Sequence, residues 1–244
     1  MFMASYDLRF AAIGQGSLYV RRTGDVIVMP SIGLEVWGKR AFFRRPDKGN
    51  ENISYDFIPP MMCRWIFESI YWHPSVVYFF DEIRILSPIR YEKTEVENEK
   101  AWSYDEAHYS VMALCDVHYL ILAHPRLVNN HADNMNISKI MGMFKDRAKR
   151  GKHRRMKKPF FGINSPDFMV HFRWVDPHDD LEQYKGIQRT EKPGLMVFDQ
   201  YDMNGRKSRI WFHPEVKQGV ISLKNITIEQ DGEEKIFNRG GDYR

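Results

Sequence analysis

The chain has 244 residues and a formal net charge of +4, and 43% of its residues are hydrophobic and 14% aromatic. These values are typical of a folded domain with a sizeable core, so they exclude a wholly disordered chain. Charged residues and prolines interrupt the apolar stretches before any reaches the roughly 18 residues that would indicate a membrane span.

The first 33 residues show only weak patterning and carry glycines at positions 14, 16, 24 and 33. We expect residues 1–33 to form an N-terminal extension, either an extra pair of strands or a loosely held arm. Asp7 and Arg9 interrupt the place where a signal peptide has its apolar run. We therefore expect a cytoplasmic protein with no membrane partner.

A strand and a helix are predicted next. Residues 34–43 predict a strand, and a polar, glycine-containing loop follows it. Pro59 and Pro60 then precede a segment with helical spacing, so we expect a helix over 61–72. The apolar positions that repeat along this helix are Met62, Trp65, Ile66 and Ile70.

The same helix carries Arg64 and Glu68, which are spaced to form an i,i+4 ion pair, and Pro74 is expected to end it. Residues 75–86 are rich in β-branched and aromatic side chains and predict a second strand. We interpret residues 90–106 as a charged loop.

A long strand and a second helix are expected in the middle of the chain. The strand covers residues 111–124, and Pro125 is expected to stop it. Asn134 or Asn136 is suited to cap the helix, which runs to a stop at Gly151.

Two further strand segments, 159–162 and 168–175, complete the order strand, helix, strand, strand, helix, strand. This order is typical of the split βαβ, or ferredoxin-like, fold, which RRM modules use to bind RNA across a four-stranded sheet. The sequence therefore predicts an α+β protein with a ferredoxin-like domain over residues 34–175.

The C-terminal part contains three strand candidates, 195–201, 208–213 and 219–228, with turn-like residues between them. They predict a small antiparallel β subdomain over residues 176–230. Residues 231–244 are expected to be a polar, mobile tail.

Positive charge is concentrated in one segment. Lys145–Lys158 holds nine Lys or Arg and one Asp, a local charge of +8, so the rest of the chain sums to −4. Such a distribution favours a polyanion-binding segment over a charged helix end that binds nothing. Together with the loop after Phe43, it supplies the candidate RNA contacts Arg44, Arg45, Lys48, Lys145, Arg147, Lys149, Arg150, Lys152, Arg154, Arg155, Lys157 and Lys158.

The sequence offers no pattern for a metal or a cofactor. Cys63 and Cys115 form no CxxC pair, and the nine histidines include no HExxH motif. We expect two reduced, buried thiols, no metal site and no cofactor.

An ordered series of residues resembles one known family. The series comprises Tyr55-Asp56, Pro59, Arg64, Glu68, Ser69–Pro74 (SIYWHP), Phe80–Arg84 (FDEIR), Pro88-Ile89, Asp116–Tyr119 (DVHY), Arg147, Gly151 and Pro159–Gly162 (PFFG). It resembles the type I-C CRISPR-associated endoribonuclease of the RAMP superfamily, the Dvulg subtype, from about Leu34 to Gly162.

The resemblance implies a fold and an activity. Members of this family have a ferredoxin-like N-terminal domain and a β-rich C-terminal part. They bind the hairpin repeat of CRISPR precursor RNA and cleave it at the 3′ base of the hairpin without metal. They then hold the 5′ handle in the Cascade complex, beside its backbone and large subunits.

The resemblance also implies a catalytic Tyr and an adjacent Lys-His pair. The Tyr falls on Tyr71 and the Lys on Lys139, but the His falls on Ile140, which cannot carry a proton. His131 and His153 are candidates to replace it. Lys139 would stabilise charge in the transition state, and Tyr71 would orient the 2′-OH, or act as a base if cations lower its pKa.

Three functions stay open at this point. The first is a metal-independent endoribonuclease that matures CRISPR RNA. The second is a non-catalytic Cascade subunit that holds the 5′ handle, which the replacement of the family His by Ile140 favours. The third is a DNA-binding protein that uses the basic helix, although no second short helix precedes it at helix-turn-helix spacing.

Overall fold

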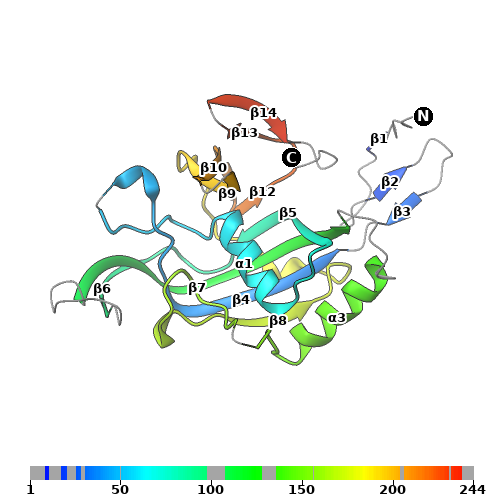
Figure 1. The fold of residues 1–244 in the computed structure, drawn as a ribbon, viewed down its shortest axis with the longest axis horizontal. Helices are drawn as coiled ribbons and strands as arrows, with labels where there is room; N and C mark the ends of the chain where they lie inside the picture. The colour runs from blue at the N-terminus through cyan, green and yellow to red at the C-terminus, as the bar shows by residue number, and fades with distance from the viewer. Residues whose placement is uncertain are drawn as a thin grey trace.

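The computed structural model describes residues 9–10, 18–20, 26–28, 31–49, 51–97, 108–127, 136–155, 157–203, 206–230 and 232–237. The described chain forms an α+β fold built on antiparallel sheets (Figure 1). No helix within these ranges combines the length and the apolar character that crossing a membrane requires.

A large antiparallel sheet forms the centre of the molecule. Its strand order is β11-β12-β5-β7-β4-β8, and β6 pairs with the first part of β7. The strands are β4 (Ile32–Ala41), β5 (Val76–Ile85), β6 (Tyr91–Glu97), β7 (His108–Leu127), β8 (His171–Val175), β11 (Val216–Lys217) and β12 (Val220–Ser222).

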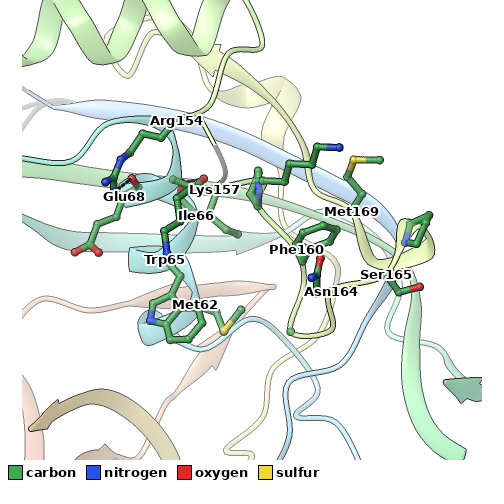
Figure 2. Close-up of a pocket in the computed structure, with 15 residues that line it drawn as sticks. Met62, Trp65, Ile66, Glu68, Arg154, Lys157, Phe160, Asn164, Ser165 and Met169 are labelled. Atoms are coloured by element: carbon green, nitrogen blue, oxygen red, sulfur yellow. Dashed lines mark hydrogen bonds between the residues drawn. The ribbon is translucent and has the colours of Figure 1, made fainter. Parts of the chain in front are cut away.

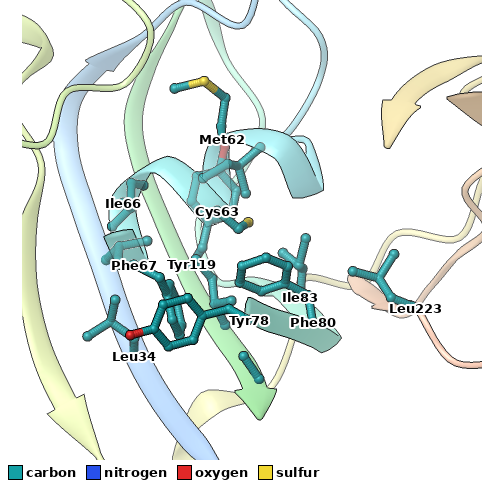
Figure 3. Packing of buried hydrophobic residues seen from close by; sticks show 14 of the residues in the cluster. Leu34, Met62, Cys63, Ile66, Phe67, Tyr78, Phe80, Ile83, Tyr119 and Leu223 are labelled. Carbon is teal, nitrogen blue, oxygen red and sulfur yellow. The ribbon is translucent and has the colours of Figure 1, made fainter. Parts of the chain in front are cut away.

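Two helices, α1 (Pro60–Ile70) and α3 (Ile137–Lys149), pack on one face of this sheet. Their contact is aromatic, because the rings of Phe67 on α1 and Phe144 on α3 have centroids 5.2 Å apart. Both rings belong to the buried cluster that includes Leu34 and Val36 of β4. Figure 3 shows how α1 fits over the strands in this core.

A second, smaller sheet carries the C-terminal strands in the order β14-β13-β10-β9. These strands are β9 (Met196–Met203), β10 (Arg206–Phe212), β13 (Ile226–Gln230) and β14 (Glu233–Phe237). Phe198 and Phe212 lie in the same cluster as the buried face of α1. The two sheets therefore share one hydrophobic core.

The remaining elements are short. The N-terminal segment contributes a three-stranded antiparallel sheet rather than the strand pair that was one of its two expected forms. Its strands are β1 (Arg9–Phe10), β2 (Leu18–Val20) and β3 (Val26–Val28), and the 3-10 turns are η1 (Pro46–Lys48), η2 (Pro166–Phe168) and η3 (Glu182–Tyr184).

The second predicted helix is confirmed in detail. The Asn136 side chain accepts a hydrogen bond of 2.8 Å from the Lys139 N–H, which satisfies a free donor at the helix start. Gly151 follows the helix at a φ of +60°, a conformation that favours glycine. The alternative cap, Asn134, lies outside the described residues.

The charged loop expected over 90–106 is wrong for residues 91–97, which form β6. Thr94 and Val96 are buried, while Glu95 and Glu97 between and after them face solvent. This alternation of buried and exposed residues is typical of a strand with one solvent-exposed face. The charged residues on that face are the reason that the sequence suggested a loop.

Pro125 does not stop the long strand, because β7 continues to Leu127. Proline lacks the N–H that a ladder needs and is tolerated where a strand has no neighbour on one side. The ladder between β4 and β7 ends at the pair Ile32 and Ala123, so among the described residues Pro125 has only Tyr78 of β5 opposite it.

Two predicted strand segments end or divide differently from expectation. Residues 159–162 form only an isolated bridge between Phe160 and Met169, and the strand after them begins at His171. The segment 219–228 divides between the two sheets, with Asn225 at a φ of +54° where the chain turns from β12 to β13.

The polar tail expected from residue 231 includes a strand, because β14 pairs with β13 along its length. The prediction for Cys115 is also wrong, since this free thiol is only half-buried, whereas Cys63 is fully buried. The division of the chain into domains remains a prediction.

Candidate nucleic-acid interface

Two arginines of the basic segment hold the C-terminal end of α1. Arg147 donates from Nη1 to the carbonyl of Ile70 at 2.8 Å. The backbone N–H of Arg154 donates to Ser69 O at 2.6 Å, and its Nη1 reaches Glu68 O at 3.4 Å. The last carbonyls of a helix lack partners within it and carry partial negative charge, so these guanidinium groups stabilise the helix end.

This capping ends α1 two residues earlier than expected. Tyr71 is the C-cap residue, with extended backbone angles of φ −143° and ψ 126°. The Arg64–Glu68 ion pair expected along this helix is also replaced, because Arg64 Nη1 lies 2.6 Å from Asp199 Oδ2 on β9. A contact to another sheet therefore takes precedence over the local i,i+4 pairing.

Tyr71, the first predicted catalytic residue, is buried beside Arg147. Its side chain is 5% exposed, and the Arg147 guanidinium lies over its ring at 5.4 Å from the centroid. Burial raises the pKa of the Tyr71 hydroxyl, and the positive charge of Arg147 only partly offsets this. The hydroxyl is thus held in its protonated form, which favours an orienting role over that of a base.

The second predicted catalytic residue, Lys139, is exposed in the first turn of α3. It precedes Arg147 by eight residues, about 12 Å along the helix axis. Tyr71 contacts the last turns of α3 through Arg147, whereas Lys139 lies at its start. The structure places the two residues at opposite ends of α3.

Ile140 is 0% exposed and belongs to the hydrophobic core together with Phe144. A histidine at position 140 would place its imidazole among apolar side chains, where an unpaired polar group is costly. Of the two candidates to replace the family His, His131 lies outside the described residues. His153 is half-buried beside Arg154, with Nδ1 2.9 Å from the Arg154 carbonyl oxygen, at the Tyr71 end of α3.

The rest of the basic segment divides into paired and unpaired side chains. Lys145 lies 3.3 Å from Asp176 and over the ring of Trp174, and Arg150 pairs with Asp146 one turn earlier. Within the described chain, five exposed side chains of the segment form no ion pair, namely Lys149, Lys152, Arg155, Lys157 and Lys158. Four of them follow α3 rather than lying on it, which argues against a basic helix that enters a DNA groove.

A groove of about 860 Å³ runs beside α1 and is closed on its other side by the loop 159–169 (Figure 2). We call it the Trp65 groove, and the lining residues that matter below are Met62, Trp65, Arg154, Lys157, Lys158 and Phe160. A second cavity of about 720 Å³ shares Met62, Trp65 and Gly162 with it, so the two cavities adjoin at these residues, and we call the pair the channel.

The second cavity brings part of the other predicted contact region to this channel. Arg44 lines it together with Arg209 of β10. Arg45 is instead held by Asp47, at 2.8 Å, and Lys48 is exposed outside both cavities. The structure therefore brings Arg44 and the end of the basic segment to one channel and leaves Arg45 and Lys48 out of it.

Sequence reasoning missed Trp65, Phe160 and Arg209 as candidate contacts. Trp65 was counted in the apolar repeat of α1, yet its side chain is 64% exposed. Met62 and Ile66 already complete the buried stripe at four-residue spacing, and Trp65 lies about 100° away from Ile66 around the helix. Phe160 belongs to the PFFG motif of the family resemblance, which indicated no contact role for it, and no sequence signal pointed to Arg209.

Comparisons with known proteins show which family the chain is similar to. The family model Cas_Cas5d, described as CRISPR-associated protein (Cas_Cas5), matches residues 31–222. A relative from Mannheimia succiniciproducens, named CRISPR pre-crRNA endoribonuclease Cas5d, is 30% identical over 224 residues, which cover 82% of this chain and 97% of the relative. A relative of the same name from Thermus thermophilus is 29% identical and covers 80% of this chain and 92% of its own length.

Two solved structures share the fold. The functionally uncharacterized protein SMU1763c from Streptococcus mutans superposes with a TM-score of 0.63 at 18% identity, over 80% of this chain and 93% of its own. A structure described as a CRISPR-associated protein gives the same TM-score and identity and covers 80% and 92%. At this level of identity the match establishes only that the fold is shared.

Proposed function

The chain belongs to the CRISPR-associated Cas5d family, and on that premise we propose that it binds the repeat hairpin of CRISPR precursor RNA and cleaves it at the 3′ base of the hairpin. Two relatives that match most of the chain are named as pre-crRNA endoribonucleases. The strand order β5-β7-β4-β8, with both helices on one face, supports the description of the central domain as ferredoxin-like and RRM-like.

One observation carries the RNA-binding part of this proposal. The Trp65 groove and its continuation are lined by Lys157 and Lys158 at one end and by Arg44 and Arg209 at the other. Lys and Arg contacts to phosphates supply most of the affinity for nucleic acid and fix its register. A cationic channel of this kind is suited to an RNA strand.

The proposed reaction needs no metal. The 2′-OH at the cut site loses its proton and attacks the adjacent phosphorus, and the bond to the 5′-oxygen breaks. The 5′-oxygen takes up a proton, and the upstream product ends in a 2′,3′-cyclic phosphate. Tyr71 as a neutral hydroxyl would orient the 2′-OH, and Lys139 would stabilise the phosphorane charge. His153, the described one of the two candidates for the missing histidine, adjoins Arg154, whose guanidinium reaches the end of α1.

A second candidate function is a non-catalytic subunit that holds the 5′ handle of the mature RNA in Cascade, beside the backbone and large subunits. The observation that favours it is Ile140, which is fully buried where the family resemblance expects a histidine. The separation between Lys139, in the first turn of α3, and Tyr71, beside its last turn, also favours a non-catalytic subunit. In the first candidate function, holding the handle follows cleavage.

One assay separates these functions. The purified chain is mixed with its cognate repeat RNA in excess EDTA, and cleavage is followed on a denaturing gel. The proposal expects cleavage that survives EDTA and stops when a single 2′-deoxy nucleotide replaces the one at the cut site. Tight binding without any cleavage would support the non-catalytic subunit, and the absence of binding would contradict both functions.

A further inference from the structure

We propose that the Trp65 groove holds one unpaired nucleotide of the RNA, with its base stacked on the Trp65 indole and its phosphate bound by Lys157 and Lys158. The inference rests on the proposed function and deepens it. It assigns this groove to single-stranded RNA that flanks the hairpin, and it assigns a base-stacking residue.

Trp65 differs from the other exposed tryptophans in what covers it. Trp37, 36% exposed, is stacked against His171 with ring centroids 5.9 Å apart. Trp72, 45% exposed, lies under the Arg154 guanidinium at 5.0 Å. Trp65 is 64% exposed, and within the described residues no ring or guanidinium group stacks on it.

The position of Trp65 makes this free ring face available to a ligand. The indole lines both cavities of the channel, so a strand that runs from one cavity to the other passes it. Figure 2 shows Met62, Trp65 and Glu68 of α1 on one side of the groove and Phe160 on the other, with Lys157 between them at one end. An aromatic ring, a second apolar wall and a nearby cation are the parts of a nucleotide site.

The charge of the groove suits a phosphate. Lys157 and Lys158 are exposed, and neither forms an ion pair with a described carboxylate. Among the described residues, Glu68 is the only acidic one that lines the first cavity, and burial raises its pKa. The described lining of the second cavity adds the cations Arg44 and Arg209 and contains no acidic residue. The lining is therefore complementary to a polyanion.

The stacking geometry selects an unpaired nucleotide. A base can lie against an indole only when it is splayed out of its own stack, which single-stranded flanks allow and a paired stem does not. A cavity of about 860 Å³ lies in the range of small-ligand sites and does not admit a duplex. The Asn164 side chain, which also lines the groove, offers a donor and an acceptor to the edge of the base.

The test uses a repeat hairpin with a 2′-deoxy nucleotide at the cut site, so that it stays intact. The fluorescent base 2-aminopurine, which stacking quenches, replaces each unpaired flanking nucleotide in turn. The wild-type chain should quench one flanking position, and Trp65→Ala should abolish that quenching and weaken binding roughly five- to 150-fold, the cost of one base–aromatic stack. Trp65→Phe should retain part of both effects.

Ile236→Ala is the control, because it removes another exposed apolar side chain. Ile236 lies on β14, is 71% exposed and lines neither cavity, so its replacement should leave quenching and affinity unchanged. Replacing both Lys157 and Lys158 with Ala should lower the salt dependence of binding by about 1.4 in log K per log salt, the value for two single-strand phosphates.

Three outcomes would overturn the inference. If Trp65→Ala binds as tightly as wild type and no flanking position is quenched, the groove does not hold a base, although repeat binding by wild type leaves the proposed function intact. An unchanged salt slope in the Lys157 and Lys158 double variant removes the phosphate site. Failure of the wild-type chain to bind the repeat at all overturns both the inference and the proposed function.

Discussion

The hydroxyl of Tyr71 is buried beside Arg147, and burial raises its pKa above that of a free tyrosine. A raised pKa means that the hydroxyl keeps its proton throughout the neutral pH range. Tyr71 can then donate a hydrogen bond to an RNA oxygen but offers almost no phenolate to accept a proton.

We predict that Tyr71→Phe lowers the single-turnover cleavage rate about 100-fold without moving the pH profile between pH 6 and 9.

Lys139→Ala should lower the rate by a similar factor while RNA affinity changes by less than about threefold, because its charge acts mainly on the transition state. Lys224→Ala, an exposed lysine between the two sheets, is the control. Wild-type rates in both variants would show that the site lies elsewhere.

A second prediction at the residue scale concerns Ile140, which is 0% exposed in the core. Ile140→His would restore the family histidine in sequence, but it would bury a polar ring without a partner. We predict a loss of roughly 2–5 kcal/mol in the free energy of unfolding, and no gain in cleavage rate. Ile140→Val should lose only about 0.5–1.5 kcal/mol.

Urea denaturation measures the free energy of unfolding of both Ile140 variants. A histidine variant that is as stable as wild type and cleaves faster would show that position 140 turns toward the RNA, contrary to the structure. The comparison with valine separates the loss of packing volume from the burial of a polar group.

At the scale of elements, the end of α1 explains why the basic segment is not uniform. Arg147 and Arg154 bind the last carbonyls of α1, whereas Lys152 and Arg155 extend into solvent. Local charge density alone does not distinguish these two groups. The distinction arises because α1 ends against the last turn of α3 and the chain that follows it.

We predict that Arg147→Ala lowers the free energy of unfolding by about 1.5–3 kcal/mol, because it leaves the Ile70 carbonyl without its charged donor. A variant with both Lys152→Ala and Arg155→Ala should stay within about 0.5 kcal/mol per residue of wild type. That double variant should instead flatten the salt dependence of RNA binding by about 0.7–0.9 per lost contact. Urea denaturation and filter binding at 50–200 mM salt test this division, and a destabilised double variant would contradict it.

At the scale of the whole molecule, the two sheets share one core. Phe198 and Phe212 of the small sheet pack in the cluster that buries α1, and Asp199 holds Arg64 at 2.6 Å. In addition, β12 from the C-terminal part pairs with β5 of the large sheet. The C-terminal strands therefore complete the central sheet and its core.

We predict that the full chain unfolds in one cooperative transition in urea, and that removing residues 196–244 prevents stable folding. The truncation exposes the apolar surface of α1 that the small sheet covers, and it strips β12 from β5. A urea titration measures the number of unfolding transitions in the full chain, and circular dichroism measures whether the truncated chain folds. Two separate transitions in the full chain, or a well-folded truncated chain, would show that the small sheet is an independent unit.

Local signals in the sequence were sufficient for both helices and for most of the longer strands, although they missed β6 and β14. The repeat of Met62 and Ile66, the Asn136 cap and the Gly151 stop each act within a few residues, so periodicity and turn chemistry reveal them. The concentration of charge in Lys145–Lys158 and the ordered family motifs are also properties of the sequence alone.

Only the tertiary structure decided which of those residues are free to act. The hydrogen bonds that occupy Arg147 and Arg154 join residues 77 and 86 positions apart, and no local pattern encodes such pairs. The same long-range packing buries Ile140, leaves Trp65 exposed in a groove and sends β12 to the large sheet. Burial and exposure depend on which surfaces meet when the chain closes into one core, and this is not determined until the elements pack together.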